Sequence, residues 1–160
     1  MIEVLKEWCR NDQKITVLKS LQGLIWKKAY EGGQLKGHVY EDVPEILKKW
    51  QMDGIRMGVF SSGSVAAQKL IYGHSETGDL TPFFSAYFDT NTGSKKDADT
   101  YIKIASSLNI EPGHILFLSD DVDELIAANK SGFQTIQLLR EGLEPAWKRS
   151  AYNFKDIIFN

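Results

Sequence analysis

Residues 115–133 read ILFLSDDVDELIAANKSGF, and this stretch decides the fold of the chain. Its apolar start predicts a buried strand over His114–Leu118, which ends where Ser119 and Asp120 begin a polar run. Asp121–Lys130 then has the apolar spacing of a helix. A buried strand that opens directly into a helix is typical of an open α/β sheet, in which ligands bind at the carboxyl ends of the strands.

The same alternation of apolar runs and helical patterns extends on both sides of this stretch. The spacing predicts further helices over residues 2–30, 42–53, 64–72, 97–108 and 144–150, and further strands over residues 55–60, 86–88, 135–139 and 157–159. Because helices separate the strands, neighbouring strands are expected to run parallel. We therefore predict an α/β fold with a Rossmann-like parallel sheet over residues 39–160, preceded by a separate helical element over residues 1–38.

Composition narrows the class of protein. A chain of 160 residues fits one ordinary domain, and a formal net charge of −2 gives no basic field for nucleic acid or for an anionic membrane surface. The single cysteine, Cys9, excludes an internal disulfide and fits a reducing compartment, so we expect a cytoplasmic protein and a buried thiol. Trp8, Trp26 and Trp50 lie on apolar helical faces and are expected in the core.

The strand predicted over residues 55–60 ends at a cluster of hydroxyls, Ser61-Ser62-Gly63-Ser64. Ser61 and Ser62 could hold an anion, since the amides at the start of the following helix carry a partial positive charge. The structural alternative is a plain helix cap and turn, which serine and glycine also form well.

Two lysines, Lys95 and Lys96, precede the helix predicted over residues 97–108. A lysine directed into a phosphate site would neutralise charge on the transferring group. The alternative is a pair of solvated lysines. We favour Lys95 for the site, because Lys96 would point outward from the start of the helix.

Four acidic side chains fall within residues 120–124, at the end of a predicted strand. Carboxylate oxygens are the ligands that Mg²⁺ prefers, and we assign the metal to Asp120. The alternative is that acids here cap the helix and favour its dipole, an interpretation we accept for Asp123. The three histidines, His38, His74 and His114, are expected to have surface or structural roles. Together the clusters predict a site for phosphate and a divalent metal.

Taken together, three segments resemble the haloacid-dehalogenase superfamily, and more closely its enolase-phosphatase (acireductone synthase) family. They are VFSSGSVAAQKLIYGHSETGDL, FDTNTGSKKDADTYIKIA and ILFLSDDVDELIAANKSGF. The stretch LKSLQGLIWKKAYEGGQLKGHVYEDV resembles the end of that family's helical cap and its return to the core.

The resemblance implies a role for each matching residue. Ser61 and Ser62 match the motif that holds the substrate phosphate, and Lys95 matches the lysine that stabilises the aspartyl-phosphate intermediate. Asp120 matches the carboxylate that binds Mg²⁺, and Glu124 falls where the family often has another acid. The implied activity is that of an Mg²⁺-dependent enzyme of methionine salvage. This enzyme enolises 2,3-diketo-5-methylthiopentyl-1-phosphate and then hydrolyses the phosphate.

One family feature has no match in this sequence. Members carry their nucleophilic aspartate in an Asp-x-Asp or Asp-x-Glu strand, and no Asp-x-Asp follows an apolar strand before Ser61. That strand lies in the middle of the family's sheet, between the strands matching residues 55–60 and 114–118. We therefore expect this chain alone to be inactive. Three arrangements are open: those two strands pair directly, another chain lies between them, or the natural protein is longer.

Three hypotheses follow for function. The first is a phosphatase whose nucleophile segment is encoded separately or is absent from this polypeptide. The second is a non-catalytic remnant that binds phosphate or metal. The third is a structural module that pairs with a complementary chain at the missing strand position. For the chain itself we expect either a monomer or a dimer that fills this position.

Overall fold

The strands of this chain form two separate parallel sheets. The structure is a computed structural model that describes residues 16–140 and 142–159. Strand β1 (Met57–Phe60) pairs with β2 (Phe84–Phe88). In the second sheet, β3 (Leu116–Ser119) pairs with β4 (Gln134–Leu138), which pairs with β5 (Ser150–Ala151). The prediction of a parallel α/β sheet is confirmed, and within the described residues β1 and β3 do not pair with each other.

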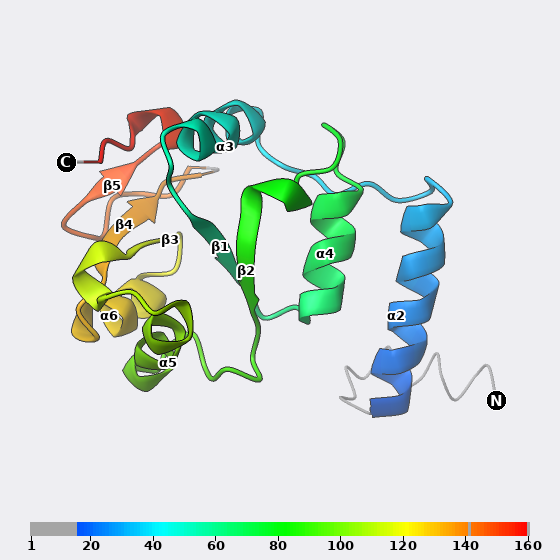
Figure 1. The fold of residues 1–160 in the computed structure, drawn as a ribbon, viewed down its shortest axis with the longest axis horizontal. Coiled ribbons are helices and arrows are strands. Elements are labelled where there is room, and N and C mark those ends of the chain that lie inside the picture. Colours follow the sequence, from blue (N-terminus) through cyan, green and yellow to red (C-terminus); the bar gives the residue numbers. More distant parts are fainter. Residues whose placement is uncertain (1–15, 141, 160) are drawn as a thin grey trace.

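The described α-helices are α2 (Thr16–Glu31), α3 (Asp42–Met52), α4 (Val65–Gly73), α5 (Ala98–Leu108) and α6 (Val122–Lys130). Figure 1 shows α2 beside α4 at one end of the molecule, α5 and α6 together at the other, and α3 across the start of β1. Ser64, Asp97 and Asp121 cap their helices with side-chain oxygens, which is why these helices begin where the sequence predicts.

Two apolar clusters cover the strands from opposite faces. On one face, α3 contributes Ile46, Leu47 and Trp50, which pack against side chains of β1 and β3 such as Met57 and Leu118. On the other face, α5 and α6 contribute a second cluster with Phe60 and Phe117. The second cluster comprises Tyr101, Ile104, Ala105, Ala127, Ala128 and Phe133. Because successive strand residues point to opposite faces, β1 and β3 are apolar on both.

The predicted helix over residues 144–150 is wrong, because this segment is a loop that ends in β5. Pro145 disfavours a helical conformation in the residue before it. Hydrogen bonds to side chains of β4 then hold the loop in place. Ala146 N–H donates to the Gln137 side chain, and Trp147 Nε1–H donates to Thr135 Oγ1.

The predicted strand over residues 157–159 is also wrong. The chain instead makes a short 3-10 turn over Phe154–Asp156, in which Asn153 and Asp156 form a reciprocal capping box. Ile157 follows this turn and is buried in the cluster beneath α3. The edge strand is therefore β5, two residues long.

The expectation for Trp26 was wrong as well, since its side chain is 47% exposed on α2. Trp50 is buried as predicted, whereas Trp8, Cys9 and the predicted helical residues 2–15 lie outside the described residues.

His38 has a partner that the sequence did not indicate, because its Nδ1 lies 3.2 Å from Glu76 Oε2. Among the helices in the described ranges, none is both long and apolar enough to cross a bilayer.

Candidate functional site

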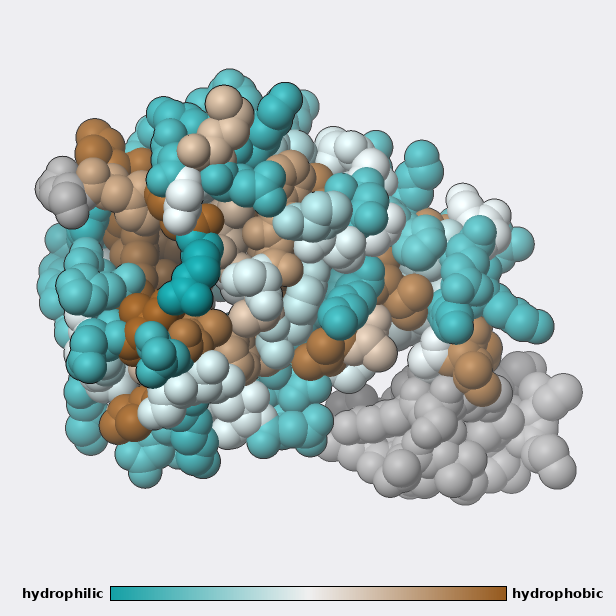
Figure 2. Space-filling view, in the orientation of Figure 1, coloured by the Kyte–Doolittle hydropathy of each residue, from teal (hydrophilic) through white to brown (hydrophobic). Residues whose placement is uncertain are grey.

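A cavity of about 1040 Å³ lies between the two sheets. Residues 54–60, leading into and along β1, line it, and residues 114–120 of the β3 segment line it as well. Lys95 and Asp120 line the same cavity near the carboxyl end of β3. Figure 2 shows a hollow with apolar walls in this face of the molecule, between α3 and the α5–α6 pair.

Lys95 connects the carboxyl ends of β1 and β3. Its Nζ lies 2.6 Å from Glu124 Oε2 on α6, and the Ser119 hydroxyl at the end of β3 donates to the same oxygen at 2.7 Å. The same Nζ lies 5.9 Å from the ring centroid of Phe60, the last residue of β1. The lysine ammonium is thus fixed where the two strands end.

Tyr101 holds the backbone of the Lys95 loop. Its hydroxyl donates to the Lys95 carbonyl oxygen at 2.6 Å. Burial, together with the negative charges of Glu124 and Asp121, raises the pKa of the Tyr101 hydroxyl well above its usual value. The phenol therefore remains a protonated donor across the physiological pH range.

Lys96 has the outward position expected for it. Its exposed ammonium lies 3.1 Å from Asp121 Oδ2 and 2.9 Å from Asp123 Oδ2. Hydrogen bonds to Asp123 and Asp121 raise the pKa of Lys96. Asp121 also caps α6 by accepting from the Asp123 N–H at 2.8 Å, so both acids have structural partners here.

Asp120 is the acid of this run that remains available to a ligand. Its carboxylate is exposed, lines the cavity, and has no hydrogen bond or ion pair to any residue in the described ranges. Within those ranges, no group of three or more His, Cys, Asp or Glu side chains is arranged to hold a metal. Mg²⁺ is commonly bound through one or two carboxylates, with waters and substrate phosphate completing the shell, so Asp120 fits as one ligand.

The hydroxyl cluster lies at the other strand end and is partly occupied by the chain itself. Ser61 Oγ accepts from the Gly63 N–H at 3.2 Å, and Ser64 Oγ caps α4 by accepting from the Ala67 N–H at 3.2 Å. Ser62 is exposed and has no partner in the described part of the chain. Ser61 directly follows Phe60, whose ring Lys95 approaches, so this cluster begins beside the lysine.

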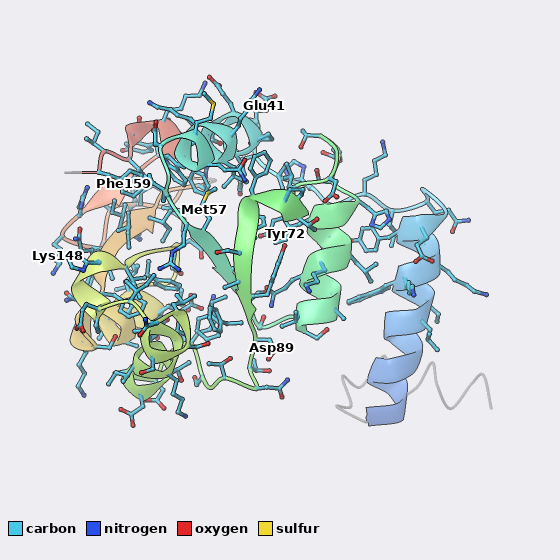
Figure 3. The ribbon with its side chains drawn as sticks, viewed as in Figure 1. Glu41, Met57, Tyr72, Asp89, Lys148 and Phe159 are labelled. Atoms are coloured by element: carbon cyan, nitrogen blue, oxygen red, sulfur yellow. The ribbon has the colours of Figure 1, made fainter. Side chains whose placement is uncertain are left out.

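Sequence reasoning missed a buried residue beside this cluster, Asp89. It lies at the end of β2, as Figure 3 shows, and its Oδ2 accepts from the Val65 N–H at 3.1 Å. Asp89 therefore takes one of the α4 amides that the predicted anion site would use. Its signal was an acid directly after the mostly apolar residues Phe84–Phe88, that is, an acid at the end of a strand, as Asp120 is.

Comparison with known proteins identifies the family to which this chain belongs. Residues 3–132 match the sequence model of the haloacid dehalogenase-like hydrolases. The chain belongs to this family. Its relatives include the enolase-phosphatase E1 of Pseudomonas fluorescens, 52% identical over 90% of this chain and 63% of the relative. The enolase-phosphatase E1 of Marinobacter nauticus is 50% identical over 98% of this chain and 69% of that protein.

Solved structures share the fold of this chain. The Saccharomyces cerevisiae UTR4 protein superimposes with a TM-score of 0.87 and 34% identity, over 97% of this chain and 73% of that one. CbbY from Rhodobacter sphaeroides, solved with phosphate, has a TM-score of 0.70 at 16% identity, which shows a shared fold. The chain spans roughly two thirds of the length of the enolase-phosphatases it matches.

Proposed function

We propose that this chain carries the phosphate- and metal-binding part of an Mg²⁺-dependent enolase-phosphatase of methionine salvage. Its substrate would be 2,3-diketo-5-methylthiopentyl-1-phosphate. The main support is the position of Lys95, held by Glu124 between the ends of β1 and β3, in a chain about half identical to proteins of that name.

Each predicted site residue has a defined task in this proposal. Lys95 would neutralise charge on the phosphate, and Ser61 and Ser62 would donate to its oxygens from the end of β1. Asp120 would supply a carboxylate ligand to Mg²⁺, which contributes positive charge at the phosphate when it is bound. Glu124 Oε2 and the Tyr101 hydroxyl hold Lys95 and its loop, so these two residues would position the lysine.

The chain alone is proposed to be inactive. Covalent phosphoryl transfer needs an attacking carboxylate close to phosphorus. Asp89, Asp121 and Glu124 have their carboxylates in hydrogen bonds or ion pairs. Asp120 is assigned to the metal, so no acid at the described strand ends is left to attack.

The decisive assay measures phosphate release with Mg²⁺ from the diketone phosphate named above. The chain would be tested alone and with the segment of the Marinobacter nauticus enolase-phosphatase that this chain does not match, made as a separate polypeptide. Background release from the chain alone and turnover by the mixture are expected. Lys95→Met and Asp120→Asn should abolish that turnover, while Lys96→Met, at an exposed ion pair, should retain it.

Two results would overturn the proposal. Turnover by the chain alone that Asp120→Asn removes would show a complete site in these residues. A stable mixture with no turnover would favour the second candidate, a remnant that binds phosphate or metal without catalysis. Because the sequence has one cysteine and the pathway's substrate is a small phosphorylated metabolite, the cytoplasm is the proposed location.

A further inference from the structure

Gln68, on α4, is almost completely buried beside the hydroxyl cluster. The residue is 3% exposed, and its Nε2 donates to two main-chain carbonyl oxygens, Gly63 O and Phe88 O, each at 2.8 Å. The Ser61 N–H donates to the same Phe88 oxygen at 3.1 Å. One side-chain amide therefore ties the loop that follows β1 to the last residue of β2.

Fold stability alone does not explain a glutamine at this position. The Oε1 of Gln68 is buried and accepts no hydrogen bond from the described residues. A buried acceptor without a partner costs free energy, which an apolar side chain of the same shape would avoid. Two carbonyl oxygens can be joined only by a group with two donors, and the NH2 of a neutral amide joins them without adding a charge. What Gln68 supplies is thus a fixed direction for these two carbonyl groups.

The bond to the Gly63 oxygen also fixes the direction of the next N–H. The peptide group between Gly63 and Ser64 is planar and trans, so its C=O and N–H point in opposite directions. Because the Gly63 C=O points to Gln68, the Ser64 N–H points away from Gln68. Ser62 and Ser64 are both exposed, and their N–H groups have no acceptor in the described part of the chain. Both donors are therefore available to a ligand.

Two of the first amides of α4, by contrast, are used within the chain. Val65 N–H donates to Asp89 Oδ2 at 3.1 Å, and Ala67 N–H donates to Ser64 Oγ at 3.2 Å. The anion site expected at this helix start therefore has free donors in the loop that precedes the helix. Lys95 supplies a positive charge at the same strand end.

We propose that Gln68 is a positioning residue of the phosphate site. By holding the Gly63 carbonyl oxygen against the end of β2, it directs the Ser64 N–H, together with the N–H and hydroxyl of Ser62, toward the phosphate oxygens. Gln68 acts through the loop, since both hydrogens of its Nε2 are donated to carbonyl oxygens. The inference rests on the proposed function, because it takes the hydroxyl cluster as the place where phosphate binds.

A titration with inorganic phosphate in the presence of Mg²⁺, followed through the amide resonances of the full chain, tests the proposal. The amides of Ser62 and Ser64 should shift on binding, while that of Val65, held by Asp89, should shift much less. Gln68→Met removes both donors with little change of shape, and it should weaken phosphate binding about tenfold or more. A merely structural role would lower the unfolding temperature and leave the affinity of the folded chain unchanged.

Gln134→Met is the matched control. Gln134 also donates through its Nε2 to a main-chain carbonyl oxygen, that of Gly113 at 3.0 Å, but it lies at the amino end of β4. This variant should bind phosphate as the parent does, and circular dichroism verifies the fold of both variants. If Gln68→Met does not fold, the parent titration decides the outcome, because a Ser64 amide that does not shift would contradict the direction that Gln68 imposes.

Three results would overturn the proposal: no phosphate-induced shift at Ser62 or Ser64 in the parent chain, equal affinity of Gln68→Met and the parent, or an equal loss of affinity in Gln134→Met. Equal affinity of Gln68→Met and a parent that binds phosphate would reject the positioning role and leave the proposed function standing. Binding that depends on Gln68, without turnover when the Marinobacter nauticus segment is added, would retain the positioning role and reject the enzymatic function.

Discussion

Lys95 and Glu124 form an ion pair of 2.6 Å in which the two side chains are 24% and 11% exposed. Glu124 also accepts from Ser119, so one carboxylate ties the Lys95 loop to the end of β3 and the first turn of α6. One side chain therefore joins three separate segments at this point.

Glu124→Gln should lower the free energy of unfolding by about 1–3 kcal/mol, because it removes a charged acceptor from two groups in a mostly buried setting. Urea unfolding measures the change. Glu111→Gln is the matched control, since Glu111 is exposed and should shift stability by no more than about 0.5 kcal/mol. Equal behaviour of the two variants would contradict a structural role for Glu124.

Tyr101→Phe should cost about 0.5–1.5 kcal/mol, the usual contribution of one hydrogen bond, because its hydroxyl donates to the Lys95 carbonyl oxygen. Tyr87→Phe is the companion variant. The Tyr87 hydroxyl is buried without a partner in the described part of the chain, so its removal should leave stability unchanged or raise it. Thermal unfolding of both variants measures the change. A larger loss of stability for Tyr87→Phe than for Tyr101→Phe would contradict this assignment.

Asp42 should make stability depend on acid pH. Burial alone raises the pKa of Asp42, but hydrogen bonds from Arg140 and from the Phe154 N–H outweigh it and hold the pKa below its usual value. Since the folded chain releases this proton more readily than the unfolded chain, the contribution is present above about pH 4 and is lost as the pH falls through the lowered pKa. Urea titrations across this range should show a shallower pH dependence for Asp42→Asn, and an identical dependence would count against the lowered pKa.

Gly37→Ala should destabilise the connection between α2 and the rest of the chain. A methyl group at Gly37 would overlap the carbonyl oxygen of Ile71, and Gly37 pairs with Ser75 in an isolated bridge. Overpacking against backbone typically costs about 1–3 kcal/mol. Gly113→Ala meets nothing within 4 Å and should be tolerated, as judged by thermal unfolding of both variants.

Local sequence signals predicted the elements around the site well. Ser64, Asp97 and Asp121 cap helices with their side chains. Each cap accepts from a backbone amide only two or three residues further along the chain, so the signal is local. Asp120 was chosen by the rule that ligands bind at the carboxyl ends of parallel strands, and Lys95 by its place in the loop before a predicted helix. Their roles toward phosphate and metal remain predictions, as does the domain boundary near residue 38.

Tertiary contacts account for what the sequence could not show. The segment over residues 144–150 has helical spacing, but Gln137 and Thr135 bind it to β4 as a loop. Asp89 was overlooked because its partner, the Val65 N–H, is 24 residues away in the chain. Lys95 pairs with Glu124 across a similar separation, and neither spacing has a periodic signature in the sequence.

The two apolar clusters have a consequence for the register of the strands they cover. Where one face of a sheet is solvated, a slip of one residue moves apolar side chains into water, and burial alone specifies the register. Because β1 and β3 are apolar on both faces, burial distinguishes one register from the next much less well. The register therefore depends on the backbone pairing with β2 and β4 and, at the end of β3, on the bond from the Ser119 hydroxyl to Glu124.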